Sequence, residues 1–268
     1  MNEPAENRSG HELRDRHVLV TGGSRGIGAA IARELAACGA SVSLVARGPE
    51  RLEEVRTGLE REFGGRHRAL AADVTDARAA AGAVAAAVAA LGPVYALVNN
   101  AGAAESASFL DSDDELWRRM LDANLMGAVH CARAVLPGMK ALRAGRIVSV
   151  ASTAGLTGYR FVSAYVAAKH ALVGLTRALA LEVAREGITV NAVCPGYTHT
   201  DLLADSVERA RVRTGRSAED IMRVYTSSNP QGRLMEPGEI ARAVVWLCAP
   251  GQSGVTGQAI PVDGGALL

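Results

Sequence analysis

The chain has 268 residues, of which 49% are hydrophobic and 21% are charged, a composition typical of soluble globular proteins. Its 29 basic and 28 acidic residues give a formal net charge of +1. This balance argues against a nucleic-acid-binding protein, because such a protein needs a basic excess to displace counterions from phosphates. No apolar run reaches the roughly 18–20 residues that cross a bilayer, which argues against a membrane protein.

The first sixteen residues are polar and include acids as well as arginines, so they lack the apolar core of a signal peptide. We expect residues 1–16 to form a flexible lead before a single domain that spans residues 17–268. The 4 cysteines lie far apart, with neither a CxxC pair nor a histidine at metal-ligand spacing. They predict reduced thiols and no metal site, and we expect a cytoplasmic protein.

Short apolar runs and helical patterns alternate along the chain from residue 17 onward. Each run has the length of a strand, and each helical pattern that follows has the length of a crossover helix. We expect strands at residues 17–21, 41–46, 69–72, 96–99, 146–151, 189–193 and 259–262. We expect helices at residues 29–38, 49–63, 77–91, 116–136, 163–186 and 239–247.

The character of these strands indicates the fold class. Several are continuous apolar runs rather than alternating ones, which is typical of a parallel sheet covered on both faces. The order of elements therefore predicts an α/β protein, a single-domain Rossmann fold with a doubly wound parallel sheet flanked by helices. Residues 196–237 have little sheet character, so we expect a small helical insertion there, a substrate lid at about 197–237.

A glycine-rich segment, Thr21-Gly-Gly-Ser-Arg-Gly-Ile-Gly28, joins the first strand to the first helix. Glycines let a backbone approach a phosphate closely, and the amino end of a helix favours negative charge, so the segment predicts a dinucleotide site. If the glycines are considered alone, the alternative interpretation is a glycine-rich turn that binds no ligand. The residues that we expect to contact a cofactor here are Gly22, Ser24, Arg25, Gly26, Ile27 and Gly28.

The spacing TGxxxGxG resembles the short-chain dehydrogenase/reductase family rather than the GxGxxG of other dinucleotide folds. Further motifs similar to those of the family follow in order, and the resemblance extends from residue 17 to residue 265. They are Asn99-Asn-Ala-Gly102, Asn124, Ser152, Tyr165-Val-Ala-Ala-Lys169, Pro195-Gly196 and Val262-Asp-Gly-Gly265.

The resemblance implies an NAD(P)-dependent oxidoreductase of CH–OH and C=O groups, and it assigns roles to individual residues. Thr198 matches the family's threonine that contacts the nicotinamide, whereas Thr200 is equally well explained as a helix cap. The implied catalytic residues are Asn124, Ser152, Tyr165 and Lys169. Further cofactor contacts are implied for Asp73, Val74, Asn100, Ala101, Gly102, Tyr165, Lys169, Pro195, Gly196 and Thr198.

Tyr165 and Lys169 are four residues apart in a predicted helix, so their side chains share one face. A nearby ammonium group would lower the pKa of Tyr165 from its usual value of about 10. Ser152 is expected to donate a hydrogen bond to the substrate oxygen. The family resemblance implies that Tyr165 protonates the carbonyl, that Lys169 also binds the nicotinamide ribose and that Asn124 holds a relay water. If the spacing of Tyr165 and Lys169 is considered alone, the alternative is that Tyr165 is an ordinary core residue and Lys169 a surface charge.

The residue at the end of the second strand distinguishes the two nicotinamide cofactors. A carboxylate there would accept hydrogen bonds from ribose hydroxyls and repel a 2′-phosphate, but this chain has Ala46 followed by Arg47. Together with Arg25, this makes two guanidinium groups and no acid, a site suited to a phosphate dianion. We therefore expect NADP(H), with NAD(H) as the less favoured cofactor.

Residues 163–177 and 187–196 resemble bacterial 3-oxoacyl reductases, polyketide ketoreductases and hydroxyacyl-CoA or hydroxybutyrate dehydrogenases. The resemblance implies NADPH-dependent reduction of a small-molecule ketone, such as a 3-oxoacyl thioester or a polyketide-type carbonyl, to a secondary alcohol. Two alternatives stay open. One is an NAD-dependent secondary-alcohol or 3-hydroxyacyl-CoA dehydrogenase that works oxidatively, and the other is a cofactor-sensing regulator without catalysis.

Two further patterns concern partners. A local excess of arginine in the lid would suit the phosphorylated handle of coenzyme A or an acyl carrier, or it is a solvated helix face. The resemblance also implies a dimer or a tetramer, and we expect a homotetramer, with a dimer as the alternative. The apolar face of the long helix with Leu172, Leu175 and Leu179 is either core or interface. The lid arginines are Arg209, Arg211, Arg213, Arg216 and Arg223.

Overall fold

The computed structural model describes residues 12–268, in which seven parallel strands form one sheet. The predicted doubly wound α/β fold is confirmed. Strand ends differ from the predicted ones by at most two residues, and the sixth strand is longer at both ends. The strands are β1 (His17–Thr21), β2 (Ser41–Ala46), β3 (Arg68–Ala71), β4 (Ala96–Asn99), β5 (Gly145–Val150), β6 (Ile188–Pro195) and β7 (Ala259–Val262).

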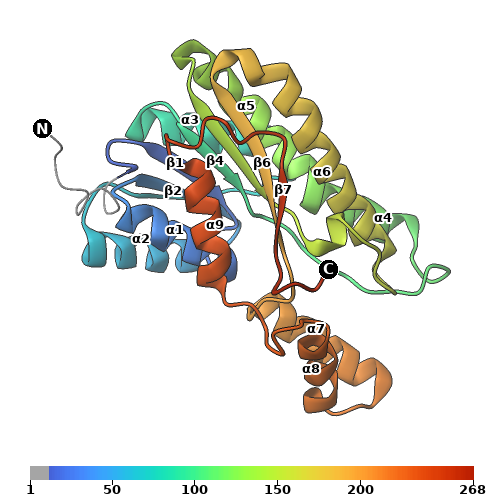
Figure 1. The fold of residues 1–268 in the computed structure, drawn as a ribbon. Coiled ribbons are helices and arrows are strands. Elements are labelled where there is room, and N and C mark those ends of the chain that lie inside the picture. The colour runs from blue at the N-terminus through green and yellow to red at the C-terminus, as the bar shows by residue number, and fades with distance from the viewer. Residues whose placement is uncertain (1–11) are drawn as a thin grey trace, which may run out of the picture.

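Helices cover both faces of the sheet (Figure 1). One face carries α1 (Gly26–Ala37), α2 (Pro49–Phe63) and α9 (Pro237–Cys248). The other carries α3 (Ala77–Leu91), α4 (Asp114–Leu121), α5 (Gly127–Leu142) and α6 (Ser163–Val183). None of the helices in the described part of the chain is long and apolar enough to span a membrane.

The two faces of the sheet bury separate hydrophobic clusters. Val18 and Val20 of β1 belong to the cluster beneath α1 and α9, whereas Leu19 between them belongs to the cluster beneath α3 and α5. All three side chains are fully buried. This arrangement explains the continuous apolar run of the strand, because a polar residue at any of the three positions would face a helix rather than solvent.

The order of the strands creates a crevice at one edge of the sheet. It runs β3-β2-β1-β4-β5-β6-β7, so the chain winds in one direction from β1 to β3 and in the other from β4 to β7. The connections that leave the carboxyl ends of β1 and β4 therefore diverge. In doubly wound sheets, ligands bind at this switch point.

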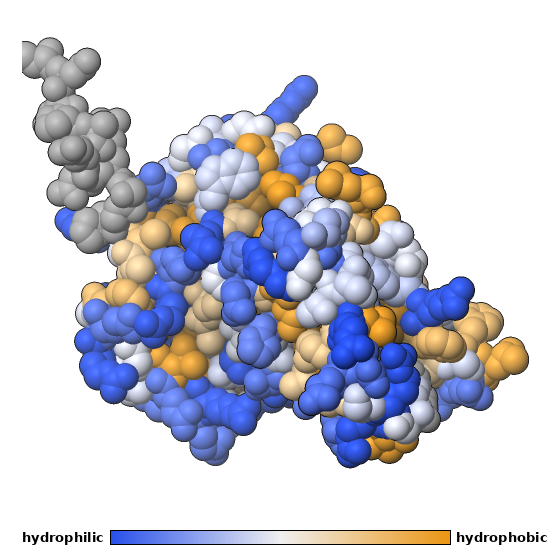
Figure 2. Space-filling model, turned by 60° about the horizontal axis from the view of Figure 1, so that its bottom comes forward, coloured by the Kyte–Doolittle hydropathy of each residue, from blue (hydrophilic) through white to orange (hydrophobic). Residues whose placement is uncertain are grey.

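Two segments lie outside the sheet and its covering helices. Leu13 is fully buried and its amide donates to the Cys38 carbonyl at 3.1 Å, so packed structure begins within the segment that we expected to be a flexible lead. Residues 1–11 of that expected lead lie outside the described residues. Residues 197–237 contain α7 (Asp201–Thr214) and α8 (Ala218–Ser227), which extend below the sheet in Figure 1. Figure 2 brings this end forward and shows mainly hydrophilic residues on the outside of the two helices.

Candidate functional site

A cavity of about 900 Å³ lies at the carboxyl ends of the central strands. Every residue that the sequence analysis assigned to catalysis or to the cofactor lines this cavity, from Gly22 to Thr198. The sheet brings them together because most of these motifs follow a strand, and the carboxyl ends of parallel strands meet at one edge. Residues of α7 and α8, among them Leu203 and Tyr225, line the lid side.

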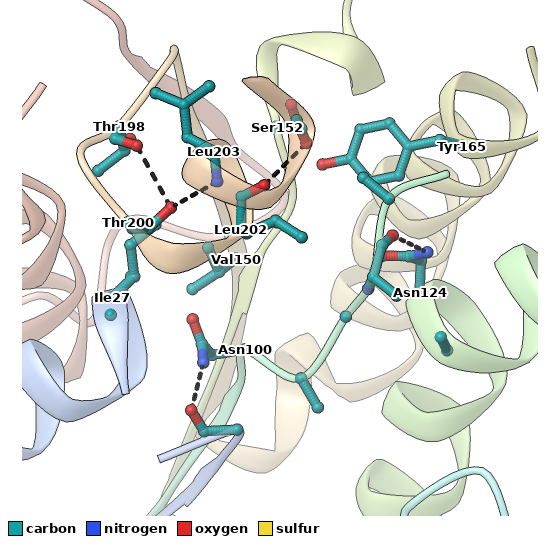
Figure 3. A pocket seen from close by; sticks show the side chains of 18 of the residues that line it. Ile27, Asn100, Asn124, Val150, Ser152, Tyr165, Thr198, Thr200, Leu202 and Leu203 are labelled. Atoms are coloured by element: carbon teal, nitrogen blue, oxygen red, sulfur yellow. Dashed lines mark hydrogen bonds between the residues drawn. The ribbon is translucent and has the colours of Figure 1, made fainter. Parts of the chain in front are cut away.

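The glycine-rich turn is packed closely against the end of β4. Gly22 and Gly26 have φ angles of 65° and 53°, which L side chains rarely adopt. Asn100 Nδ2 donates to the carbonyls of Thr21 and Gly22 at 3.0 and 3.1 Å (Figure 3). A Cβ on Gly28 would collide with the Gly22 carbonyl and with the Asn100 amide. The backbone therefore lines the cavity without side chains in the way, and the turn fits the pyrophosphate of a dinucleotide.

Tyr165 and Lys169 lie on one face of α6, and both line the cavity. The Tyr165 hydroxyl points toward Ser152, which follows the end of β5 (Figure 3). Lys169 is only 4% exposed, its Nζ donates to the Val150 carbonyl at 3.0 Å, and it lies 5.7 Å from the centroid of the Tyr165 ring. The alternative of a surface lysine is therefore wrong, and three of the four predicted catalytic side chains, Ser152, Tyr165 and Lys169, lie close together.

The electrostatics of this group differ from the expectation. Burial raises the pKa of Tyr165, and the influence that lowers it comes from a hydrogen bond with Ser152. Burial also lowers the pKa of Lys169 to about 8. The prediction that Lys169 lowers the pKa of Tyr165 is thus wrong for the protein alone. The reason is that the low-dielectric pocket disfavours both charged forms, while the Lys169 ammonium is directed at a backbone carbonyl.

Asn124 comes from a π-helical turn, Asp122–Met126, between α4 and α5. It is 2% exposed, and its Nδ2 donates to the carbonyls of Ala103 and Met120, both at 2.9 Å. Its Oδ1 accepts from the Ala103 amide at 3.3 Å. Such turns are frequent at functional sites because they re-aim one side chain. The bonds fix Asn124 at the cavity wall, and its relay water stays a prediction.

Arginines surround the part of the cavity next to β2. Arg47 follows β2 directly, is exposed and makes no ion pair within the described residues. Arg25 and Arg51 both contact Asp201, the first residue of α7, at 3.3 and 3.7 Å. The expectation of a site without an acid is therefore wrong, because the lid supplies one. The sequence analysis missed Arg51, although its spacing of four from Arg47 across the first turn of α2 is a usable signal.

Asp73 and Val74, two of the expected cofactor contacts, line the cavity after β3. Asp73 Oδ1 accepts hydrogen bonds from the amide and the hydroxyl of Thr75, at 2.9 and 2.8 Å. Val74 is 7% exposed, and its carbonyl lies 3.0 Å from His130 Nδ1. Asp73 is therefore held by the segment between β3 and α3, and Val74 by a contact with α5, rather than by the lid.

Thr198 and Thr200 are bonded differently. Thr198 is 6% exposed, and its hydroxyl donates to the Gly196 carbonyl at 2.9 Å. Thr200 Oγ1 accepts from the Leu203 amide at 3.4 Å as the N-cap of α7 (Figure 3). The helix-cap interpretation of Thr200 is confirmed. Thr198, next to the Pro195-Gly196 turn, stays the predicted contact for the nicotinamide.

A group of tyrosines that the sequence analysis did not identify lines the lid side of the cavity. Tyr197 packs edge-on against Tyr159, with ring centroids 6.1 Å apart, and is tilted against Tyr225 of α8 at 4.5 Å. Burial raises the pKa of Tyr197. The sequence signal that could have placed Tyr197 at the cavity is its position directly after Pro195-Gly196. The wall offers flat apolar surface that suits an acyl chain or a ring.

The lid arginines fall into two groups. Arg209 lines the cavity, and its guanidinium donates to the Ala104 carbonyl at 3.2 Å. Arg211 and Arg223 instead pair with acids of their own helices at 2.7 and 3.5 Å, which favours the solvated-face interpretation for them. Arg216 is exposed after α7, and the side chain of Arg213 lies outside the described residues.

Comparisons with known proteins agree with this geometry. The model of the short chain dehydrogenase family matches residues 16–211. The chain is 41% identical over 249 residues to a putative ketoacyl reductase of Streptomyces coelicolor, with 92% of this chain and 95% of that protein covered. It is 36% identical over 251 residues to a D-beta-hydroxybutyrate dehydrogenase of Rhizobium meliloti, with 92% and 96% covered.

A solved structure is similar over nearly the whole chain. It is that of a single-substitution variant of the actinorhodin polyketide ketoreductase with NADPH, and it matches with a TM-score of 0.90 and 40% sequence identity. The match covers 94% of this chain and 97% of that chain. At this identity the likeness extends beyond the fold to the family.

Proposed function

The chain belongs to the short-chain dehydrogenase family and is an oxidoreductase of CH–OH and C=O groups that uses NAD(P); on that premise, we propose that it reduces the ketone of a 3-oxoacyl or polyketide-type thioester with NADPH. The observation that carries the proposal is the meeting of Ser152, Tyr165 and Lys169 in the cavity that the glycine-rich turn also lines. The name of the Streptomyces relative, a ketoacyl reductase, supports the substrate class.

NADP(H) is supported by the charges around the end of β2. Arg47 is exposed there beside Ala46, and Arg25 and Arg51 line the same part of the cavity. Guanidinium groups bind phosphate oxygens in a planar, charge-assisted geometry, so three of them suit a 2′-phosphate. The related ketoreductase structure with NADPH gives independent support.

The side chains divide the chemistry at the carbonyl between them. When bound, NADPH supplies a hydride to the carbonyl carbon. Tyr165 donates its proton to the carbonyl oxygen, and its raised pKa keeps the hydroxyl protonated at neutral pH. Ser152, toward which the Tyr165 hydroxyl points, donates a hydrogen bond to the same oxygen. Lys169, with a pKa of about 8, is mostly an ammonium at neutral pH, and its Nζ lies 5.7 Å from the centroid of the Tyr165 ring.

The remaining residues bind the cofactor or move the proton. We assign the pyrophosphate to the glycine-rich turn, the adenine to Asp73 and Val74, and the nicotinamide carboxamide to Thr198. Asn124 holds the water through which the proton on Tyr165 is restored, and Lys169 also binds the nicotinamide ribose. These roles rest on the family motifs and on the fact that all these residues line one cavity.

The acyl part of the substrate is assigned to the tyrosine wall. Tyr197 and Tyr225 present apolar ring surface next to the predicted catalytic group, and Leu202 and Val224 line the same side. Arg209 lines the cavity beside them, where it suits the phosphate of a phosphopantetheine handle, whether on a carrier protein or in coenzyme A.

The test is a panel of 3-oxoacyl thioesters and cyclic ketones, each with NADPH and with NADH, followed by absorbance at 340 nm. We expect oxidation of NADPH with the thioesters and weaker turnover with NADH. Turnover only of a hydroxyacyl substrate with NAD⁺ would support the oxidative dehydrogenase instead. Binding of cofactor without turnover of any substrate would support a regulator.

A further inference from the structure

Asp201 is an acidic residue on the lid that reaches the dinucleotide end of the cavity. Its Oδ2 lies 3.3 Å from Arg25 Nη1 and 3.7 Å from Arg51 Nη1. One carboxylate thus joins the glycine-rich turn, the first turn of α2 and the first turn of α7. All three side chains are more than half exposed, so each ion pair is weak and a stronger anion is able to displace the carboxylate.

The fold, rather than chance, places Asp201 there. Thr200, the residue before it, caps α7 and packs against the glycine-rich turn. A Cβ built on Gly26 would lie 3.3 Å from Thr200 Cγ2, and Figure 3 shows Thr200 above Ile27 at the start of α1. The start of the lid therefore lies next to the turn, with little room for a side chain at Gly26, and the next side chain along the lid contacts the arginine of that turn.

We infer that Asp201 is an internal competitor for the 2′-phosphate of the cofactor and so limits the preference for NADP(H) over NAD(H). A carboxylate and a phosphate are both oxyanions that guanidinium groups bind in the same planar geometry. Two such anions on the same guanidinium groups repel each other, so the phosphate has to displace Asp201 from Arg25 and Arg51. The identity of the ligand rests on the proposed function, but the contact does not.

The exchange has a consequence for each cofactor. A ligand with a 2′-phosphate gains contacts to Arg25 and Arg51 only at the expense of their ion pairs with Asp201, so its net gain in affinity is reduced. A ligand without this phosphate leaves the ion pairs intact, and its affinity does not depend on Asp201. Removal of the carboxylate therefore affects only the phosphorylated ligand.

The experiment compares Asp201→Asn with Asp205→Asn, which carries the same change of net charge one helical turn later. Asp205 is exposed and makes no ion pair in the part of the chain that the structure describes. The probes are 2′,5′-ADP and ADP, titrated by calorimetry at low salt. We expect Asp201→Asn to bind 2′,5′-ADP about three- to tenfold more tightly than wild type, with ADP unchanged. Asp205→Asn should alter neither affinity.

An unchanged or weakened affinity of Asp201→Asn for 2′,5′-ADP would overturn the inference, and weakening would mean that Asp201 orients the arginines for the phosphate. Asp201→Ser, which also removes the carboxylate, should repeat the gain, and thermal melts check that each variant is folded. The wild-type protein tests the proposed cofactor separately. If it binds ADP and 2′,5′-ADP equally, the NADP(H) proposal fails, while a gain in Asp201→Asn would still support the competition.

Discussion

On the proposed function, two adjacent residues at the end of β2 are predicted to decide which ribose the site accepts. Ala46 offers no acceptor for ribose hydroxyls, and the exposed Arg47 offers a guanidinium group without an acid attached to it among the described residues. A carboxylate at position 46 would reverse both properties, because it would accept from the 2′-hydroxyl and repel a 2′-phosphate.

Replacement of Arg47 should therefore separate the two cofactors. Arg47→Ala is expected to weaken NADPH binding about tenfold, the equivalent of about 1.4 kcal/mol for one charge-assisted contact, and to leave NADH binding unchanged. Ala46→Asp/Arg47→Ala should reverse the preference. The measurement is kcat/KM for both cofactors. Equal losses for NADPH and NADH would show that Arg47 has a structural role instead.

Single residues also show where the sequence stops being informative. Motif spacing identified Tyr165, Lys169 and Ser152, and the structure brings them together because each follows or faces the carboxyl end of a strand. Asp201 was missed because its contacts are to Arg25 and Arg51, which are close only after folding. The pKa of Tyr165 was misjudged because burial, which no spacing reveals, raises it and outweighs the lowering effect of the hydrogen bond with Ser152.

At the scale of single elements, β2 is stabilised by a buried histidine. His67 Nδ1 accepts from the Val42 amide at 3.1 Å, and its Nε2 lies 2.9 Å from the Gly64 carbonyl, so the ring is neutral with its proton on Nε2. Burial lowers the pKa of His67 below 6.5. The unfolded chain then binds a proton more readily, so stability rises with pH and is lost as pH falls below about 6.5.

The contact of His67 with β2 predicts that the protein is less stable in acid. The free energy of unfolding in urea should fall by on the order of 1 kcal/mol between pH 7 and pH 5, because protonation removes the acceptor of a buried amide. His67→Asn, whose Oδ1 still accepts from Val42, should show a smaller fall. The matched control is His170→Asn at an exposed position of α6. The same fall in His67→Asn and wild type would contradict this role.

Two helical glycines should respond oppositely to the same substitution. A Cβ on Gly28 in α1 would collide with the Gly22 carbonyl, whereas a Cβ on Gly82 in α3 meets nothing within 4 Å. Gly28→Ala is therefore expected to destabilise the protein by on the order of 1–3 kcal/mol and to weaken cofactor binding. Gly82→Ala should stabilise it by about 0.5–1 kcal/mol. Urea unfolding of both variants checks this pair, and equal effects would contradict it.

Elements were predictable where one physical signal dominated. Continuous apolar runs located β1 and β4 to the residue, because both strands are buried on two faces. The helices predicted around 116–136 are α4, a π-helical turn and α5, and α5 continues past Pro137 to Leu142. Proline favours a helix end, but here the fully buried Met139 lies beyond it and packs on the core, so tertiary packing prevails.

At the scale of the whole molecule, the sheet and the lid have separate hydrophobic cores. Leu203, Val207 and Ile221 form a cluster of their own between α7 and α8. α7 and α8 therefore pack on each other, whereas Met235 near the end of the lid belongs to the cluster beneath α1 and α9. Polar contacts such as Arg209 to the Ala104 carbonyl also join the lid to the sheet. The cavity lies between the sheet and the lid, so the proposed function has substrate and cofactor meet at this boundary.

Exposed leucines on α5 and α6 bear on the assembly of the protein. The predicted face of α6 is core, because Leu172 is 2% exposed and Leu175 and Leu179 pack against buried clusters. Leu181 on the same helix is 83% exposed, and Leu142 at the end of α5 is 53% exposed.

We still expect a homotetramer, in which these exposed leucines are covered by neighbouring subunits. Light scattering of the purified protein at micromolar concentration should give four times the mass of one chain. A mass of one chain or of two would contradict the tetramer.

The most direct test of the proposed reaction is a comparison of wild type with Tyr165→Phe. With NADPH and a 3-oxoacyl thioester, wild type should oxidise NADPH and form the secondary alcohol in equal amounts. Tyr165→Phe should bind NADPH with unchanged affinity but react about 10²–10⁴-fold more slowly, because a phenyl ring has no proton to give. Near-normal turnover in Tyr165→Phe, or a wild type that transfers hydride only from NADH, would contradict an NADPH-dependent ketoreductase with Tyr165 as its acid.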